Sequence, residues 1–135
     1  MRTIRILILE DDLETLSKLL SGLHRLEELL VSSHKIDLAI TVLSEYTQVE
    51  DYINPTGRVK YDIILLDRDC KAGGSFHVLD TKKFNPARII SISSVPDYNE
   101  AARKFGVNRI VHKDYSQLGK FVDNVISQIE ELITN

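Results

Sequence analysis

The sequence predicts an α/β fold in which one parallel sheet carries helices on both faces. Residues 4–9 (IRILIL) and 63–66 (IILL) are largely apolar runs without regular alternation, which is typical of strands covered on both sides. Strand-like runs alternate with stretches of helical spacing five times along the chain, and this alternation favours parallel strands joined by helical crossovers. A chain of 135 residues suits one domain, residues 1–135.

Composition narrows the functional classes. Hydrophobic residues make up 43% of the chain and charged residues 27%, as in ordinary globular domains. The net charge of −3 gives no basic footprint for direct nucleic-acid binding. Cys70 is the single cysteine, so no intramolecular disulfide can form. The N-terminal apolar run is too short for a signal peptide or a membrane span, so we expect a cytoplasmic protein without membrane insertion.

The first half of the chain shows two strands and two helices. Residues 4–9 form the first expected strand, which ends on acidic residues. A helix of about five turns follows, with Asp12 as its N-cap and one face turned inward. That face is expected to carry Leu13, Leu16, Leu20, Leu23 and Leu30. Residues 36–42 form a second strand, and a short helix over 46–53 ends at the breaker 54–57 (NPTG).

The second half repeats the alternation three times. The strand 63–66 stops on Asp67, the loop 70–75 (CKAGGS) follows, and a short helix is expected over 76–84, ended by Pro86. A strand over 88–93 comes next, followed by a helix that begins with a capping box of Asp97 and Glu100 and has Gly106 just after its end. A strand over 107–112 follows. The last helix begins with a capping box of Asp114 and Gln117. That last helix is striped by Leu118, Phe121, Val122, Val125, Ile129 and Leu132.

Five such units fit a flavodoxin-like (βα)5 arrangement with strand order 2-1-3-4-5. In this order the switch point lies between the first and third strands, which are the two strands that end in acidic residues. Ligands of open α/β sheets bind at this point. Topology and chemistry therefore indicate the same crevice.

Glu10, Asp11 and Asp67 are expected to meet in that crevice. Two unit charges about 4 Å apart, at an effective dielectric constant near 20, repel by roughly 4 kcal/mol. A divalent cation relieves this repulsion, and Mg²⁺ binds through carboxylates, waters and phosphate oxygens. Lys113 could pair with Asp67 or with a phosphoryl group, and Ser93 supplies a hydroxyl at the next strand end. Together these residues indicate a phosphoryl-transfer pocket.

Each residue also has a plain structural interpretation. The acids at 10–12 suit the positive N-terminus of a helix, a strand-end Asp or Ser is common in turns, and a lysine is most often solvated. Ser91 competes with Ser93 as the hydroxyl of the pocket. The joint occurrence at successive strand ends is what favours a site.

Over essentially its whole length the sequence resembles the response-regulator receiver domains of two-component signalling. The motifs are ILILEDD at 6–12, YDIILLD at 61–67, IISISS at 89–94 and FGVNRIVHKD at 105–114. The resemblance implies that Asp67 accepts a phosphoryl group, that Asp11 binds Mg²⁺ directly and that Glu10 acts through water. It further implies that Asp69 offers Mg²⁺ its backbone carbonyl, that Ser93 is the switch hydroxyl and that Lys113 contacts the phosphoryl group.

The chain departs from the usual receiver pattern at four places. Asp114 stands where receivers usually carry proline, and Ile110 where an aromatic switch residue is common; His112 is not assigned that role. The loop after Asp67 lacks the usual apolar-proline pair. The side chain of Asp69 adds an acid beside the pocket.

We expect a stand-alone receiver that a histidine kinase or a phosphotransfer protein phosphorylates on Asp67. Its output would pass to an unidentified downstream protein through the fourth helix, fifth strand and fifth helix, residues 97–135. Such a protein is not an enzyme beyond its own phosphorylation and dephosphorylation. Two alternatives stay open: a pseudo-receiver that binds partners without phosphorylation, and a haloacid-dehalogenase-like phosphatase, whose DxD motif the stretch 63–70 also fits.

Overall fold

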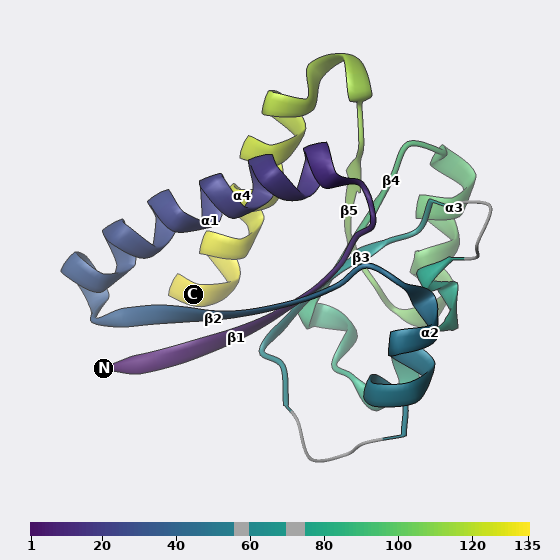
Figure 1. Cartoon of the computed structure of the whole chain (residues 1–135), viewed down its shortest axis with the longest axis horizontal. Coiled ribbons are helices and arrows are strands. Elements are labelled where there is room, and N and C mark those ends of the chain that lie inside the picture. The colour runs from purple at the N-terminus through teal and green to yellow at the C-terminus, as the bar shows by residue number, and fades with distance from the viewer. Residues whose placement is uncertain (56–59, 70–74) are drawn as a thin grey trace.

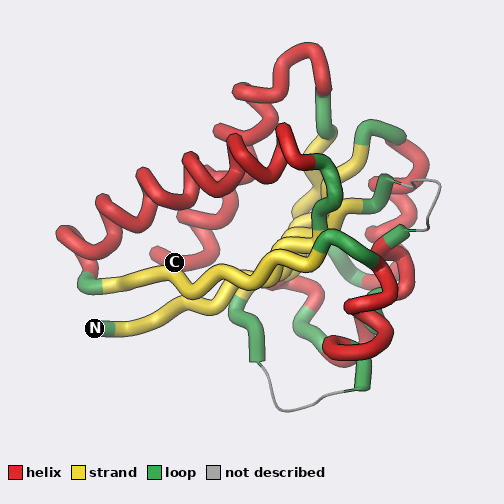
Figure 2. Tube along the Cα trace, viewed as in Figure 1, coloured by secondary structure: helices red, strands yellow, loops and turns green. Residues whose placement is uncertain are grey.

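A parallel sheet of five strands in the order β2-β1-β3-β4-β5 lies at the centre of the molecule (Figures 1 and 2). The computed structural model describes residues 1–55, 60–69 and 75–135. The strands are β1 (Arg2–Leu9), β2 (Ile36–Leu43), β3 (Ile63–Asp67), β4 (Ile89–Ser93) and β5 (Arg109–His112). The predicted fold class and strand order are confirmed.

Helices cover both faces of the sheet, because successive side chains of a strand point to opposite sides. Ile6 and Ile8 of β1 pack in one core with the long helices α1 (Leu13–His34) and α4 (Leu118–Thr134). Leu7 and Leu9 pack in a second core on the other face. There the cover consists of short elements, α2 (Tyr46–Gln48), the π-helical turn Val49–Ile53, several 3₁₀ turns and α3 (Pro96–Ala101) (Figure 1).

Helix α1 is longer than predicted, and its buried face is rotated from the expected one. Asp12 is the N-cap, as predicted, and its carboxylate accepts a hydrogen bond from the backbone N–H of Thr15 at 3.0 Å. Leu13 is 78% exposed and Leu20 41% exposed, so both were wrongly assigned to the core. The buried leucines are Leu16, Leu19, Leu23, Leu26 and Leu30. Leucine was frequent enough in this helix to suggest two overlapping stripes, and contact with the sheet and α4 selects one.

Helices α1 and α4 approach closely at Gly22. A Cβ atom at this position would lie 2.9 Å from Cγ1 of Ile126 in α4. The buried stripe of α4 follows the prediction, except that Ile133 is buried and Leu132 is only partly buried against the same core. The absence of a side chain at Gly22 therefore sets how near the two helices lie.

No α-helix forms over 76–84, which corrects the prediction. The chain instead makes the 3₁₀ turns Phe76–Val78, Thr81–Lys83 and Pro86–Arg88. Each turn follows a polar residue whose side chain accepts a hydrogen bond from the N–H two positions on: Ser75, Asp80 and Asn85. Such side chains compete with helix continuation. Pro86, expected to end a helix, opens the third turn at its first position.

Helix α3, which is the fourth predicted helix, is also capped differently from the prediction. Its N-cap is Val95, whose side chain makes no capping hydrogen bond, and Pro96 occupies the first helical turn, so the Asp97–Glu100 capping box is wrong. Proline suits this place because the first N–H groups of a helix have no intrahelical partner. Gly106 ends the following 3₁₀ turn with φ of 85°, which confirms its role at the C-terminus.

Asp114 caps the 3₁₀ turn Tyr115–Gln117 rather than an α-helix. Its carboxylate accepts a hydrogen bond from the N–H of Ser116 at 2.9 Å, and α4 begins one turn later. The Gln117 half of the predicted capping box is absent, since Gln117 is the N-cap residue of α4 and makes no side-chain cap bond.

Two predicted segments lie partly outside the described residues. These are the breaker 54–57, of which 56 and 57 are not described, and the loop 70–75, of which only Ser75 is described. Within the described parts of the chain, none of the helices is both long enough and apolar enough to cross a membrane.

Candidate functional site

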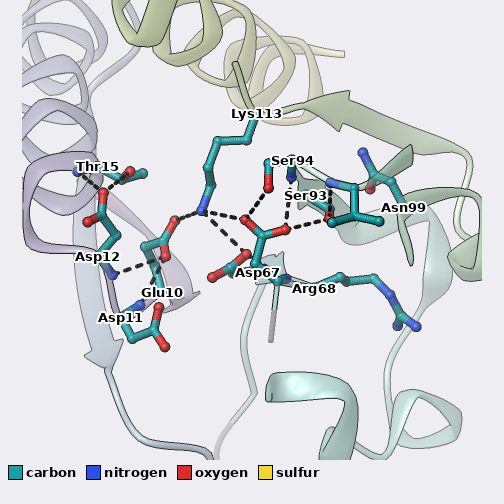
Figure 3. A network of polar contacts seen from close by, with 12 residues as sticks. Glu10, Asp11, Asp12, Thr15, Asp67, Arg68, Ser93, Ser94, Asn99 and Lys113 are labelled. Carbon is teal, nitrogen blue, oxygen red and sulfur yellow. Dashed lines mark hydrogen bonds and ion pairs between the residues drawn. The ribbon is translucent and has the colours of Figure 1, made fainter. Parts of the chain in front are cut away.

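The carboxyl ends of β1, β3, β4 and β5 meet at one edge of the sheet, and the polar side chains gather there. Glu10 follows β1, Asp67 and Ser93 end β3 and β4, and Lys113 follows β5. All four are buried, with exposed fractions of 1% or less. Figure 3 shows Lys113 extending between Glu10 and Asp67. Parallel pairing brings these residues together, because it places every strand's carboxyl end at the same edge.

Lys113 contacts three carboxylates. Its Nζ lies 2.6 Å from Oε1 of Glu10, 3.4 Å from Oδ1 of Asp67 and 3.7 Å from Oδ2 of Asp69. Burial alone would lower the pKa of Lys113, but the charges of Glu10 and Asp67 outweigh it and raise that pKa above its ordinary value. Lys113 is therefore a fixed cation. Sequence reasoning named Asp67 as its partner, whereas Glu10 is the nearest one.

Glu10 is held at both oxygens. Oε1 accepts the hydrogen bond of Lys113, and Oε2 accepts from the backbone N–H groups of Asp11 and Asp12 at 3.0 and 3.2 Å. Backbone groups at the start of α1 thus orient this carboxylate. These hydrogen bonds therefore fix the orientation of the carboxylate at the strand end.

Asp67 has one satisfied oxygen and one that lacks a partner. Oδ1 accepts a hydrogen bond from the N–H of Asp69 at 3.0 Å. Oδ2 is buried and has no hydrogen-bond partner among the described residues. Burial, followed by the charge of Glu10, raises the pKa of Asp67 to about 8, although Lys113 acts in the opposite direction. Buried oxygens without partners are rare in folded proteins, so this oxygen is a candidate contact for a ligand.

Glu10, Asp11 and Asp67 each offer one carboxylate oxygen to a common point. These oxygens all lie within 4.8 Å of one another. Asp11 is only partly buried, so this corner of the pocket is open to solvent on its side. An all-oxygen donor set with an orphaned buried oxygen fits a hard divalent cation such as Mg²⁺.

Ser93 and Ser91 face different surroundings. The hydroxyl of Ser93 donates to Oδ1 of Asp69 at 2.6 Å and accepts from the N–H of Val95 at 2.9 Å. The hydroxyl of Ser91 donates to Oδ1 of Asn99 at 2.6 Å, inside the protein. Of the two serines, Ser93 is the one that takes part in the pocket.

The side chain of Asp69 turns into the pocket. Oδ1 accepts from the backbone N–H of Ser94 at 2.9 Å as well as from Ser93, and Oδ2 accepts from the hydroxyl groups of Ser94 and Tyr115 at 3.1 and 3.2 Å. Burial would raise the pKa of Asp69, but the hydrogen bonds from Ser93 and Ser94 and the charge of Lys113 lower it. Asp69 is therefore an ionised part of the site.

Sequence reasoning did not find Ser94, Tyr115 or Asn99. Burial, ahead of the charge of Asp69, raises the pKa of Tyr115 to about 12, so its phenol keeps the proton that it donates. Nζ of Lys113 also lies 5.5 Å from the centre of the Tyr115 ring. The only sequence signal for any of these residues was the presence of an aromatic residue, Tyr115, two positions after Lys113. Ile110, in the usual aromatic position, is partly buried, and His112 is exposed.

Several solved structures with this architecture are response regulators. The chain is similar to a response regulator receiver domain from Rhodospirillum rubrum, with a TM-score of 0.64 and 16% identity over 95% of this chain and 94% of that chain. It is similar to the Mn(2+)-bound form of response regulator Rcp1, with a TM-score of 0.62 and 18% identity over 92% of each chain.

A third similar structure is the bacteriophytochrome response regulator AtBRR, with a TM-score of 0.56 and 22% identity over 92% of this chain and 93% of that chain. No protein-family model and no curated protein sequence matches the chain. Identities this low carry the fold rather than the function. The described chain has the fold of a response regulator receiver domain.

Proposed function

We propose that the protein is a receiver that accepts a phosphoryl group on Asp67 with the help of a divalent cation, Mg²⁺. The observation that carries this proposal is Oδ2 of Asp67, a buried carboxylate oxygen without a hydrogen-bond partner among the described residues. The carboxylate of Asp67 lies near those of Glu10 and Asp11, and its other oxygen, Oδ1, lies 3.4 Å from Nζ of the fixed cation Lys113. A nucleophile, a cation site and a second positive charge are what phosphoryl transfer needs.

Asp67 would attack phosphorus with a carboxylate oxygen. A new O–P bond forms as the bond from phosphorus to the donor breaks: the P–N bond of a phosphohistidine or the P–O bond of acetyl phosphate. The electron pair leaves with the imidazole, which takes up a proton, or with acetate. Lys113 neutralises charge on the phosphoryl oxygens, and Ser93 donates a hydrogen bond to one of them.

Glu10, Asp11 and Asp67 would hold Mg²⁺. When bound, the cation supplies positive charge that offsets the carboxylates and the phosphoryl oxygens. Both oxygens of Glu10 accept hydrogen bonds, which supports a role for Glu10 through water, and Asp11 and Asp67 are the proposed direct ligands. The backbone carbonyl of Asp69 remains a proposed further ligand. A response regulator of similar fold was solved in a Mn(2+)-bound form, which supports a divalent metal as the cofactor.

The proposed partners are those of a signalling protein. A histidine kinase or a phosphotransfer protein would donate the phosphoryl group, and an unidentified downstream protein would read residues 97–135. This surface includes α3, β5 and α4, and its elements connect to the pocket through Ser93 and Lys113. The protein would act in the cytoplasm and would catalyse only changes of its own phosphorylation.

The test is intact-mass spectrometry after incubation with acetyl phosphate, with and without Mg²⁺. We expect wild type to gain one phosphoryl group only with Mg²⁺, and Asp67→Asn to gain none. Asp51→Asn is the matched control, since Asp51 is exposed on the π-helical turn; it should be phosphorylated as wild type is. Beryllofluoride, a stable phosphoryl analogue, serves as a second probe if the adduct hydrolyses quickly.

Failure of both probes would contradict the proposal. If wild type neither gained a phosphoryl group nor bound beryllofluoride, the pseudo-receiver alternative would take its place. Turnover of a small phosphate ester with release of inorganic phosphate would instead favour the haloacid-dehalogenase-like phosphatase.

A further inference from the structure

The donors that would hold a phosphoryl group on Asp67 already hold a carboxylate. Ser93 Oγ donates to Oδ1 of Asp69 at 2.6 Å, the Ser94 N–H donates to the same oxygen at 2.9 Å, and the hydroxyl groups of Ser94 and Tyr115 donate to Oδ2. Lys113 Nζ lies 3.7 Å from Oδ2. The carboxylate thus has four hydrogen bonds and a cation within 4 Å.

These contacts make a specific site for an anion. The hydrogen-bond donors come from two separate parts of the chain: the end of β4 with the residue after it, and the 3₁₀ turn after β5. Ser93 is itself fixed, because its oxygen accepts the N–H of Val95. The side chain of Asp69 is only 15% exposed. A chance surface contact would not gather three hydroxyl groups, an amide and an ammonium group around one carboxylate.

The same donors would serve two anions that cannot both occupy the site. Lys113 Nζ lies 3.4 Å from Asp67 and 3.7 Å from Asp69, so it sits between the phosphorylation site and the competing carboxylate. A phosphoryl group on Asp67 would need Lys113 and Ser93, and it would carry negative charge next to Asp69. Like charges brought close together repel strongly in a partly buried site.

We propose that the Asp69 carboxylate is an internal substitute for the phosphoryl group. It takes the bonds of Ser93, Ser94, Tyr115 and Lys113 in the unmodified chain and must leave them before a phosphoryl group can bind there. This inference rests on the proposed function of Asp67. It follows that the resting protein already holds Ser93 turned into the pocket, and that phosphorylation replaces one anion by another.

The first test measures the affinity of beryllofluoride in the presence of Mg²⁺ by isothermal titration calorimetry. A tethered group competes at an effective concentration in the millimolar range, so Asp69→Ala should bind beryllofluoride about tenfold more tightly than wild type, or better. Asp69→Asn should lie between the two, because its amide oxygen still accepts hydrogen bonds. Asp51→Asn, which removes one exposed carboxylate elsewhere, should match wild type.

Two results would overturn the inference. Equal affinity of wild type and Asp69→Ala would show that the carboxylate does not compete. Equal gains in Asp69→Asn and Asp69→Ala would show that the loss of charge alone accounts for the effect.

The second test needs no phosphoryl group. Hydrogen exchange at the N–H of Val95, read by NMR, reports whether Ser93 stays in place. It should be faster in Asp69→Ala than in wild type, while exchange in the buried part of α1 stays the same and shows that the variant is folded. Unchanged exchange at Val95 would contradict the inference.

The two proposals fail in distinguishable ways. If no variant binds beryllofluoride or becomes phosphorylated, the proposed function is wrong, and exchange at Val95 still decides whether Asp69 holds Ser93. If wild type and Asp69→Ala are phosphorylated at the same rate and bind beryllofluoride equally, the function stands and the role of Asp69 falls.

Discussion

Lys113 is the residue on which the electrostatics of the pocket depend. It is a buried cation, and its nearest partner, Glu10, is a buried anion with no exposed surface. A buried ion pair is stable only while both partners are present, because either one alone is an uncompensated charge in a poorly solvated place. The strand ends therefore stay together through a charge balance as well as through packing.

Replacement of Lys113 by methionine should destabilise the protein strongly. Lys113→Met leaves Glu10 buried without its cation, and the loss of one partner of a buried pair costs about 3–5 kcal/mol of unfolding free energy. The double variant Lys113→Met, Glu10→Gln should recover a large part of this loss, since the stranded charge is gone. Urea unfolding at neutral pH without divalent metal measures the unfolding free energy of both variants. A double variant no more stable than the single one would contradict this account.

Asp67 should make the metal-free protein less stable as the pH rises. Its pKa in the folded protein, raised by burial and by the charge of Glu10 to about 8, exceeds the ordinary value of 3.8. Between these values the folded chain binds more protons than the unfolded chain, so the unfolding free energy falls as the pH increases through this window.

Asp67→Asn removes this dependence. At pH 4 the variant and wild type should have similar stability, and by pH 8 the variant should be more stable by about 1–3 kcal/mol. Thermal unfolding in EDTA across this range measures the difference. If the difference in stability between Asp67→Asn and wild type stayed constant with pH, the pKa of Asp67 would not be raised in the folded protein.

At the scale of elements, the two faces of the sheet are built differently. Helices α1 and α4 pack along one face as long amphipathic helices, and the opposite face is covered by short helices and 3₁₀ turns (Figure 2). The close contact at Gly22 fixes the α1–α4 side. The other side carries α3 and its link to the sheet through Asn99, whose amide bonds both Ser91 and the carbonyl of Val111.

A larger side chain at Gly22 should separate α1 from α4. Gly22→Leu forces atoms into the space of Ile126, and overpacking of this kind costs about 1–3 kcal/mol. Gly119→Ala in α4 is the matched control, because no atom lies within 4 Å of a Cβ placed there. It should be neutral or stabilising by about 0.5 kcal/mol. Chemical denaturation measures the unfolding free energy of the two variants. Equal stability of Gly22→Leu and Gly119→Ala would indicate that α1 and α4 can move apart without loss of stability.

At the scale of the whole molecule, the carboxylate cluster couples metal binding to folding. Glu10 and Asp11 follow β1 and Asp67 ends β3, so the three converge only in the folded chain. A ligand that binds the folded state alone stabilises it by mass action, by about 2.7 kcal/mol at a hundred times its dissociation constant.

Mg²⁺ should therefore raise the melting temperature of the protein in a concentration-dependent way. Asp11→Asn should lose most of this rise, because a direct ligand is gone, and Asp51→Asn should keep it. Differential scanning calorimetry over a Mg²⁺ series makes the measurement. An equal rise in Asp11→Asn and wild type would place the cation elsewhere.

The sequence by itself determined the sheet, its strand order and the residues at the strand ends. Largely apolar runs are typical of strands covered on both faces, and the abrupt change from Leu66 to Asp67 marks where the central strand ends. These signals are local, so they can be read without the fold. Asp12 and Gly106 were predictable for the same reason, because caps depend on neighbouring residues.

Only the tertiary structure decided which leucines of α1 are buried, that 76–84 forms 3₁₀ turns, and where the side chain of Asp69 points. Leu13 and Leu16 are equal in a helical pattern, and contact with the sheet separates them. Asp69 meets Ser93, Ser94 and Tyr115 because β3, β4 and the turn after β5 end at one edge. Such contacts join residues 24 to 46 positions apart, so no local pattern specifies them.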